Sequence, residues 1–358
     1  MLERRECAGN PCKWRVCVSE DDGESAADGR TLLMHACAQS DVDRRRVVDV
    51  VKYLVDDLRA DVAAVDRRGR TALYHAVEAG QQDAAAYLLA RPASRQRLVD
   101  ADRRSLLVAA VAAGRPDMVS LLLQSAAVGR QLATLTDAAG RGPVHHWATT
   151  SSDDATPDDK ARRAAILLDL VAHRCDCGAP DDAGVTALMS AAGGGRTTAV
   201  GALLQLRDGG AAAAAAAVDA DAADARGRTA LHHCCAATPP SLRCCRALVR
   251  AGADANAADT AGVTPLMLAC QAYVPGANVA VIRYLVEKGS ADPVKQDCEG
   301  RDSYDYCPPI DSQYVRAVLR SASGRPAVHQ HYDFHSMYRC SDVTESMVTT
   351  RSPFCGHT

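Results

Sequence analysis

Hydrophobic residues recur along this chain at helical spacing, in short segments separated by polar breaks. One segment contains Leu73, Ala76 and Val77, and another contains Met118 and Leu122. Residues three or four positions apart share one face of a helix, so each segment predicts a short amphipathic helix. Because neither helix of a pair can bury its apolar face alone, we expect successive pairs to stack on one another.

One short phrase opens these helix pairs again and again. It reads Gly-Arg-Thr-Ala-Leu at 69–73 and Gly-Val-Thr-Pro-Leu at 262–266. Clear copies of the phrase begin at Gly29, Gly69, Gly184, Gly227 and Gly262, and weaker copies begin near Arg104, Gly140 and Gly300. Several copies in tandem indicate a repeat architecture.

The residue types of the phrase have physical roles. Glycine adopts positive φ without steric cost, which suits a tight turn. The threonine hydroxyl can cap the helix that follows, and Pro265 fits the first helical position. Gly252 and Gly289 are expected to end two of the second helices in the left-handed conformation.

The phrase resembles the ankyrin signature Gly-x-Thr-Pro-Leu-His-x-Ala, and segments 246–256 and 278–289 resemble the second helix of that repeat with its final glycine. The resemblance covers roughly residues 25–322 and about eight repeats. It implies an all-α fold, an ankyrin-repeat solenoid of helix-turn-helix pairs with β-hairpin or turn fingers. It also implies that His145 and His232, at the signature histidine, are structural residues that bond within the turn.

Three regions follow from this pattern. Residues 1–27 form an N-terminal extension and residues 28–322 form the array. Residues 323–358 form a tail rich in His, Cys, Ser and Thr, and we expect both ends to be flexible or partly disordered. Insertions lengthen the array near 148–160, which is polar, and near 206–220, which contains an alanine tract.

Composition narrows the class of protein. Hydrophobic residues make up 47% of the chain but aromatic residues only 4%, so the core must be built from small side chains. A net charge of -3 and a pI near 6.4 give no reason to expect nucleic-acid binding. The 15 cysteines are an odd number and include neighbours such as Cys234 and Cys235, which favours a reducing compartment. With no secretory signal and no apolar run near the ~20 residues that a membrane span needs, we expect a soluble monomer in the cytoplasm, or also in the nucleus.

The strongest candidate binding residues are arginines at the turns that open the repeats. In an ankyrin array these turns and the first helices line one concave face, where a basic stripe could bind an acidic protein partner. The alternative is that these arginines are merely solvated, since isolated surface charges contribute little. The candidate residues are Arg30, Arg67, Arg68, Arg103, Arg104, Arg141 and Arg226, with Arg70 and Arg228 beside them.

Metal-ligand residue types occur, but their spacing matches no known finger. Cys175 and Cys177 are better explained by packing at a helix end, and Cys7, Cys12 and Cys17 have no obvious fourth ligand. The tail contains His329, His331, His335, Cys340, Cys355 and His357, which are more typical of a polar tail than of a zinc site. We therefore expect no metal and no cofactor.

Catalysis is not indicated either. No phosphate-binding loop or hydrolase motif occurs, and His35, His75, His146 and His233 show no carboxylate or nucleophile partner in the sequence. The function we expect is that of a non-catalytic scaffold that binds one or more proteins on the concave face. The alternative is an adaptor, such as a ubiquitin-ligase substrate receptor, that recruits machinery through its termini.

Two modification sites are candidates. Asn256 occupies the asparagine that asparaginyl hydroxylases modify in many ankyrin proteins, although it could equally be an ordinary turn residue. Ser151 precedes an acidic run and resembles a site for an acidic-directed kinase.

Overall fold

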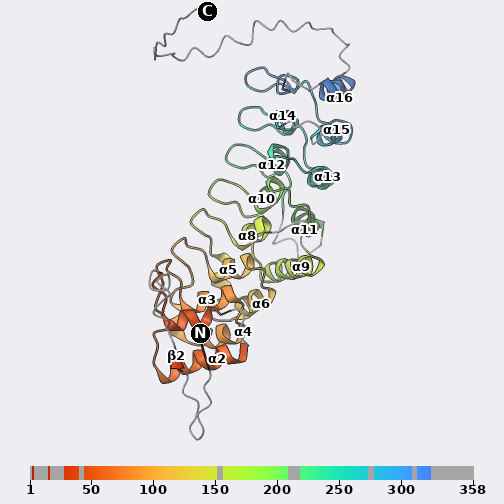
Figure 1. Ribbon diagram of the computed structural model, residues 1–358. Coiled ribbons are helices and arrows are strands. Elements are labelled where there is room, and N and C mark those ends of the chain that lie inside the picture. Colours follow the sequence, from red (N-terminus) through yellow and green to blue (C-terminus); the bar gives the residue numbers. More distant parts are fainter. Residues whose placement is uncertain are drawn as a thin grey trace, which may run out of the picture.

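The computed structural model describes residues 2–3, 15–16, 28–39, 44–150, 156–208, 218–272, 278–308 and 313–323. These residues form a stack of helix pairs that continues from one end of the chain toward the other (Figure 1). One column contains the first, or inner, helix of each pair, and a second column contains the outer helices. Loops that we call fingers project from the inner column, away from the outer one.

Seven complete pairs lie within the described residues. The inner helices are α1 (Leu32–Cys37), α3 (Ala72–Ala79), α5 (Leu106–Ala112), α8 (Pro143–Thr150), α10 (Ala187–Gly193), α12 (Ala230–Ala236) and α14 (Pro265–Gln271). The outer helices are α2 (Arg44–Lys52) with its π-helical continuation η1 (Tyr53–Asp57), α4 (Gln82–Leu89), α6 (Pro116–Gln124), α9 (Pro157–Ala172), α11 (Thr197–Asp208), α13 (Leu242–Arg250) and α15 (Val279–Glu287). Two additional short helices, η2 (Pro92–Arg95) and α7 (Gly129–Thr134), lengthen the second and third units.

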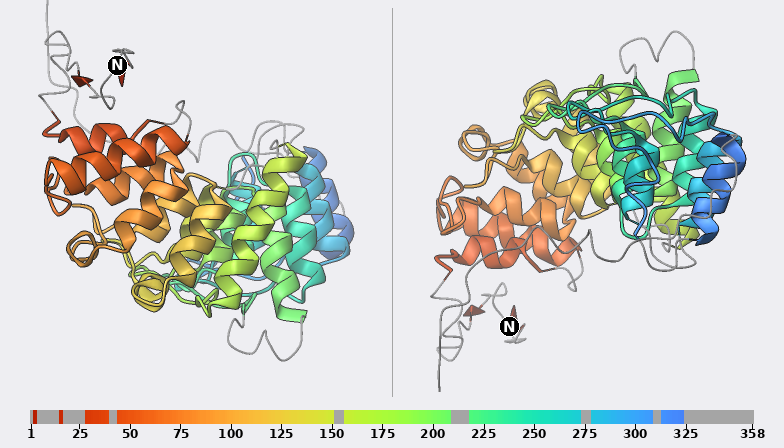
Figure 2. Two further views of the ribbon diagram at one scale, coloured as in Figure 1. Left: turned by 90° about the horizontal axis from the view of Figure 1, so that it is seen from below. Right: turned by 90° about the horizontal axis from the view of Figure 1, so that it is seen from above.

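Stacking between neighbouring pairs builds the core. Each inner helix packs against the next inner helix, and most outer helices pack against the next outer helix, as the side-by-side rows of Figure 2 show. One hydrophobic cluster extends from Leu33 to Leu319 and consists largely of Leu, Val, Ala and Cys. Every described cysteine is a free thiol, and all of these except Cys298 are buried, as expected for reduced cysteines used as small hydrophobes.

The repeated phrase caps the inner helices in the expected way. The hydroxyls of Thr71, Thr186 and Thr264 each accept a hydrogen bond from the backbone N–H three residues later, over 3.3–3.4 Å. Pro265 is the first residue of α14. The local sequence therefore specifies where these inner helices begin.

One predicted helix end is wrong. Gly252 has φ +88° and follows α13 in the left-handed region, as expected. Gly289 does not have positive φ, and the left-handed residue after α15 is Ser290, with φ 54°. The turn at this end is therefore displaced by one residue, and the main-chain N–H groups of both Lys288 and Gly289 bond to the Tyr284 carbonyl.

The insertions are partly helical. Residues 148–150 complete α8, and residues 157–160 form the first turn of α9, the longest helix in the described part of the chain. Near the second insertion, α11 continues to Asp208, and Val218 and Ala220 are buried in the core. Ser151 and the rest of 151–155, and the alanine tract within 209–217, lie outside the described residues.

The eighth copy of the phrase has no inner helix. Residues 302–307 form turns in which Asp302 Oδ1 accepts from the Tyr304 N–H and Asp305 Oδ2 accepts from the Asp302 N–H. Two prolines, Pro308 and Pro309, follow directly and prevent a helix from continuing. Helix α16 (Gln313–Ser323) then packs on α15 and ends the array.

The terminal regions are described only in part. Strands β1 (Leu2–Glu3) and β2 (Arg15–Val16) pair antiparallel, and the remaining residues up to 27 lie outside the described part. Residues 324–358, which include the whole His/Cys set of the tail, also lie outside it. Among the described residues, no helix combines the length and hydrophobicity that a membrane span requires.

Candidate functional site

The fingers have a common base built on an aspartate. Asp66, Asp137, Asp224 and their counterparts each begin a turn of the pattern Asp-x-x-Gly-x. In Asp66, Oδ1 accepts backbone N–H bonds from Arg68 and Arg70 at 2.9 and 2.8 Å, and the same pair of bonds recurs at Asp137, Asp181, Asp224, Asp259 and Asp297. We call this aspartate and the residue four positions later the base of the finger, and the three residues between them its tip.

The second carboxylate oxygen of the base is bound by a donor nine residues along the chain. His75 Nε2 lies 3.1 Å from Asp66 Oδ2, His146 Nε2 lies 3.0 Å from Asp137 Oδ2, and His233 Nε2 lies 2.9 Å from Asp224 Oδ2. In the eighth finger, Tyr306 Oη donates to Asp297 Oδ2 over 2.7 Å. Three of the four histidines for which the sequence indicated no carboxylate partner therefore have one, and that expectation was wrong. The constant spacing of nine residues was the signal that would have revealed it.

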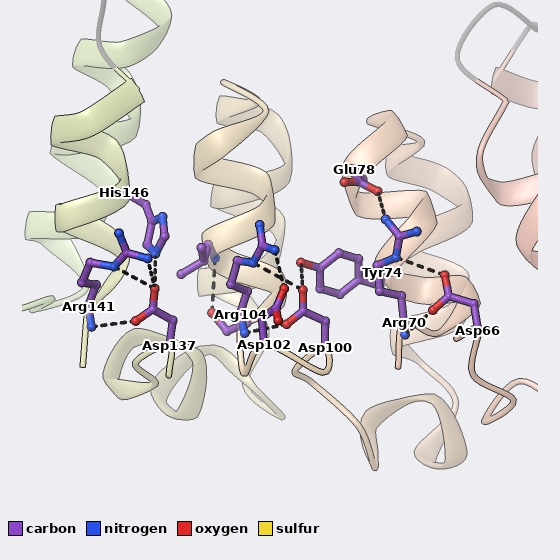
Figure 3. A network of polar contacts seen from close by, with 12 residues as sticks. Asp66, Arg70, Tyr74, Glu78, Asp100, Asp102, Arg104, Asp137, Arg141 and His146 are labelled. Atoms are coloured by element: carbon purple, nitrogen blue, oxygen red, sulfur yellow. Dashed lines mark hydrogen bonds and ion pairs between the residues drawn. The ribbon is translucent and has the colours of Figure 1, made fainter. Parts of the chain in front are cut away.

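Where the ninth residue cannot donate, the preceding repeat supplies the donor. Asp100 is followed nine residues later by Ala109, and Tyr74 Oη of the preceding inner helix donates to Asp100 Oδ2 instead. Asp259 is followed by Leu268, and Arg228 Nε of the preceding finger donates to it over 3.2 Å. Figure 3 shows these networks along three consecutive fingers. The bases thus link neighbouring repeats as well as closing their own turns.

Most arginines that follow the glycine belong to these bases. Arg70 Nε donates to Asp66 over 3.1 Å and Arg70 Nη1 to Glu78 over 3.3 Å, and the Arg70 side chain is 9% exposed. Arg141 and Arg301 bond in the same way to Asp137 and Asp297. Arg104 lies 2.6 Å from Asp102 and 3.6 Å from Asp100. Their charges are therefore balanced by carboxylates of the same finger.

The electrostatics of the base favour ionised aspartate and neutral histidine. Burial alone would raise the pKa of Asp137, but backbone and side-chain hydrogen bonds from Arg141, Ala139 and His146 outweigh it and lower the pKa to about 2. The pKa of Asp66 is lowered in the same way despite burial. Burial lowers the pKa of His75 and of His146, which disfavours the imidazolium form. These groups form a structural network with no nucleophile.

The arginines of the tips are different. Arg67, Arg68, Arg103 and Arg226 are exposed, and within the described residues their side chains form no hydrogen bond or ion pair. Neighbouring tips are joined through the main chain, because Arg67 N–H donates to the Asp28 carbonyl and Ala101 N–H donates to the Arg68 carbonyl. Arg67, Arg68 and Arg103 therefore lie on two joined fingers, the second and the third, whereas Arg226 lies on the sixth finger.

Arg103 has an unusual backbone. It occupies the glycine position of its finger and has φ 60°, while the glycines at this position of the other fingers have φ between 68° and 78°. An L-residue in the left-handed region is disfavoured by roughly 1 kcal/mol or more relative to glycine. The Arg103 N–H nevertheless donates to the Asp100 carbonyl, as glycine does elsewhere, so the turn itself is preserved.

Arg30 and Asn256, two further candidates from the sequence, lie outside the second and third fingers. Arg30 lies on the first finger, 3.8 Å from Asp28. Asn256 Nδ2 donates to the Ser290 carbonyl and its Oδ1 accepts from the Asp292 N–H, so its side chain bridges two successive repeats. Its φ is not positive, so it is not a left-handed turn residue.

The signature histidines are structural, as predicted. His232 Nδ1 accepts from the Thr229 N–H over 3.1 Å, and its Nε2 lies 3.0 Å from the Val263 carbonyl. His145 makes the corresponding contacts with Gly142 and Val185. Each therefore joins its turn to the next finger.

Metal-ligand types do not converge in the described residues. No group of three or more His, Cys, Asp or Glu side chains there could hold an ion. Cys175 and Cys177 are buried beyond the end of α9, and burial raises the pKa of the Cys175 thiol to about 12. Packing at the helix end thus accounts for both.

Comparisons with known proteins agree with this architecture. The chain matches the family described as ankyrin repeats (3 copies) over residues 10–97, 160–259 and 211–297, and it belongs to that family. Residues 98–159 lie between the matched ranges. They contain the inner helices α5 and α8 and the outer helix α6, in the same arrangement as in the matched repeats. Ankyrin repeats are generally protein-interaction modules, and no catalytic domain is evident within the matched ranges.

A solved structure shows the same fold. The crystal structure of the ankyrin repeat domain of Bcl-3, a member of the IkappaB protein family, aligns with a TM-score of 0.52 and 24% sequence identity. The alignment covers 67% of this chain and 94% of that one. At this identity the likeness concerns the fold alone. A search of curated proteins found no match.

Proposed function

We propose that this protein is a non-catalytic scaffold that binds a protein partner on its concave face, the side formed by the finger tips and the exposed positions of the inner helices. The observation that carries the proposal is the contrast between base and tip within the second, third and sixth fingers. Buried ionic contacts hold the bases rigidly, while arginines on the tips are exposed and unpaired. A rigid frame that presents unpaired polar groups loses little conformational entropy when a partner binds.

The partner-binding residues that we propose differ in whether their guanidinium groups are already paired with carboxylates. The guanidinium groups of Arg67, Arg68, Arg103 and Arg226 have no partner among the described residues. Those of Arg30, Arg104 and Arg141 already face carboxylates of their own fingers, so they contribute shape and hydrogen bonding more than net charge. The partner is one or more proteins, and the scaffold acts as a monomer in the cytoplasm or the nucleus.

A matched pair of substitutions tests the face. Ser190 lies on the inner helix α10, at the position that His146 and His233 occupy in their repeats, and it is half-buried. Gln205 lies on the outer helix α11 of the same repeat and is exposed. We expect Ser190→Arg to lose partners captured from cells by the tagged full chain, while Gln205→Arg retains them, as quantified by mass spectrometry.

The same experiment addresses the adaptor function. If Ser190→Arg retains every partner and a chain lacking residues 324–358 loses them all, recruitment occurs through the tail and the concave-face proposal is wrong.

We also propose Asn256 and Ser151 as modification sites, for hydroxylation and phosphorylation respectively. The amide of Asn256 bonds to Ser290 and Asp292, so a hydroxylase must first separate two repeats locally. Peptide mass spectrometry of protein from cells tests both marks, and unmodified peptides at full coverage would contradict them.

A further inference from the structure

The second and third fingers differ from all later fingers in the charge of their tips. Arg67 and Arg68 form one tip with Gly69, and Arg103 completes the next. The later tips contain Ala138 and Ala139, Asp182 and Ala183, Ala225 and Arg226, Thr260 and Ala261, and Cys298 and Glu299. Within the described fingers, adjacent tips with unpaired positive charge therefore occur only at this end of the array.

The repeats around these two fingers also have a net positive charge. Residues 28–135 contain sixteen Lys and Arg against thirteen Asp and Glu, whereas residues 136–308 contain sixteen against twenty-one. Asp102, the acidic residue nearest to Arg103 in the chain, is neutralised by Arg104 at 2.6 Å. An extended acidic segment would be attracted to the first repeats and repelled by the later ones.

The left-handed backbone of Arg103 is a second, independent sign that the tip of the third finger has a function. The seven other fingers place glycine at this position, where a Cβ atom at Gly69 or Gly184 would come within 3.1 or 2.7 Å of the next finger's main chain. The third finger instead carries a long cationic side chain on a left-handed backbone, although glycine would relieve the strain. Local strain of this kind is tolerated where a side chain has a function.

From these observations we propose that the tips of the second and third fingers bind an acidic polypeptide segment of the partner, through Arg67, Arg68 and Arg103. This inference rests on the proposed function and specifies the chemistry of the partner. Arginine matches carboxylates with paired, directional donors, and a main-chain bond from the Ala101 N–H to the Arg68 carbonyl joins the two tips that carry the three side chains. Three arginines are fewer than the roughly six to ten phosphate contacts that make DNA binding strongly salt-dependent, so a peptide is the better match.

The test uses the full chain and a fluorescein-labelled dodecamer of glutamate, measured by fluorescence anisotropy. We expect the triple variant Arg67→Ala, Arg68→Ala, Arg103→Gly to bind at least about tenfold more weakly than the unaltered chain. The control variant removes three exposed arginines away from the fingers, Arg130→Ala, Arg243→Ala and Arg250→Ala, and should bind within about twofold of the unaltered chain. High salt should weaken binding to the unaltered chain but change that of the triple variant little.

The single variant Arg103→Gly separates the role of Arg103 in peptide binding from its effect on the stability of the fold. It should raise the thermal unfolding midpoint, by about 2 °C, while weakening glutamate binding about threefold. A variant that becomes more stable with unchanged binding would show that Arg103 has no part in recognition.

Other outcomes overturn the inference without touching the proposed function. Equal binding by the triple and control variants means that the fingers do not recognise acidic peptides, and tighter binding of a thymidine dodecamer means a nucleic-acid surface. In either case the Ser190 and Gln205 comparison still reports whether a protein binds the concave face. Conversely, glutamate binding that depends on the three arginines, with partner capture insensitive to Ser190→Arg, supports this surface and contradicts the wider concave face.

Discussion

The base and the tip of a finger are only a few residues apart, but in the second and third fingers they have opposite physical character. At the base, Asp66 and Asp137 have side chains that are 1% and 3% exposed and accept several hydrogen bonds each. At the tip, Arg67, Arg68 and Arg103 are exposed and unpaired. Arginine thus has two roles here. After the glycine, as in Arg70 and Arg141, it balances a buried carboxylate, and before or at the glycine it is available to a partner.

The largest effect is expected at a base. Asp66→Ala removes the acceptor of Arg68, Arg70 and His75 and leaves Arg70 with only Glu78, so we expect the free energy of unfolding to fall by about 3 kcal/mol. Urea denaturation followed by circular dichroism measures the change. Asp102→Ala, at an exposed tip, should cost less than about 0.5 kcal/mol, and equal losses would remove the distinction between base and tip.

The second effect depends on pH. The pKa of Asp137 is about 2 in the folded chain against an ordinary value of 3.8, so its contribution is fully present above 3.8 and is lost as the pH falls toward 2. It should amount to about 2 kcal/mol at pH 6, since one pKa unit corresponds to roughly 1.4 kcal/mol. Denaturation of the unaltered chain and of Asp137→Asn at pH 6, 4 and 3 should show two curves that converge at low pH. A difference that stays constant with pH would mean that the carboxylate charge is irrelevant.

A third pair of variants separates clash from backbone strain in the tips. Gly184 and Gly300 have φ 78° and 76°, but a Cβ at Gly184 would lie 2.7 Å from the Ala225 nitrogen, whereas Gly300 has open space. Gly184→Ala should therefore destabilise by about 2 kcal/mol or more, and Gly300→Ala by about 1 kcal/mol. Similar losses at both positions would mean that the close approach between fingers is not what selects glycine.

The smallest expected effect is the change in the stability of the folded chain when the arginines of a tip are replaced. Arg67→Glu with Arg68→Glu should change the free energy of unfolding by no more than about 0.5 kcal/mol, because neither side chain has a partner in the part of the chain that the structure describes. Thermal denaturation of the double variant checks this. A larger loss would assign these arginines to the structure instead of to recognition.

Much of this could be predicted from the repeated phrase. Thr71 and Thr264 cap the helices that follow, Gly69 and Gly262 have positive φ, and His232 bonds within its turn and to the next finger. These features depend on residues close together in the sequence, where backbone preferences and short-range hydrogen bonds decide the outcome. Gly289 shows the limit, because the turn after α15 shifted by one residue to Ser290.

The sequence by itself determined the class of protein, the beginning of each inner helix and the set of arginines near the turns. Only the tertiary structure decided which of those arginines are free. Arg228 reaches Asp259 and Tyr74 reaches Asp100 because stacking places one repeat against the next, and these contacts span 31 and 26 residues. The pairing of a charge is a property of the three-dimensional neighbourhood, since the energy of an ion pair depends on distance and burial and not on separation along the chain. The same stacking left Arg67, Arg68 and Arg103 on adjacent tips, where no carboxylate of the described residues pairs with them.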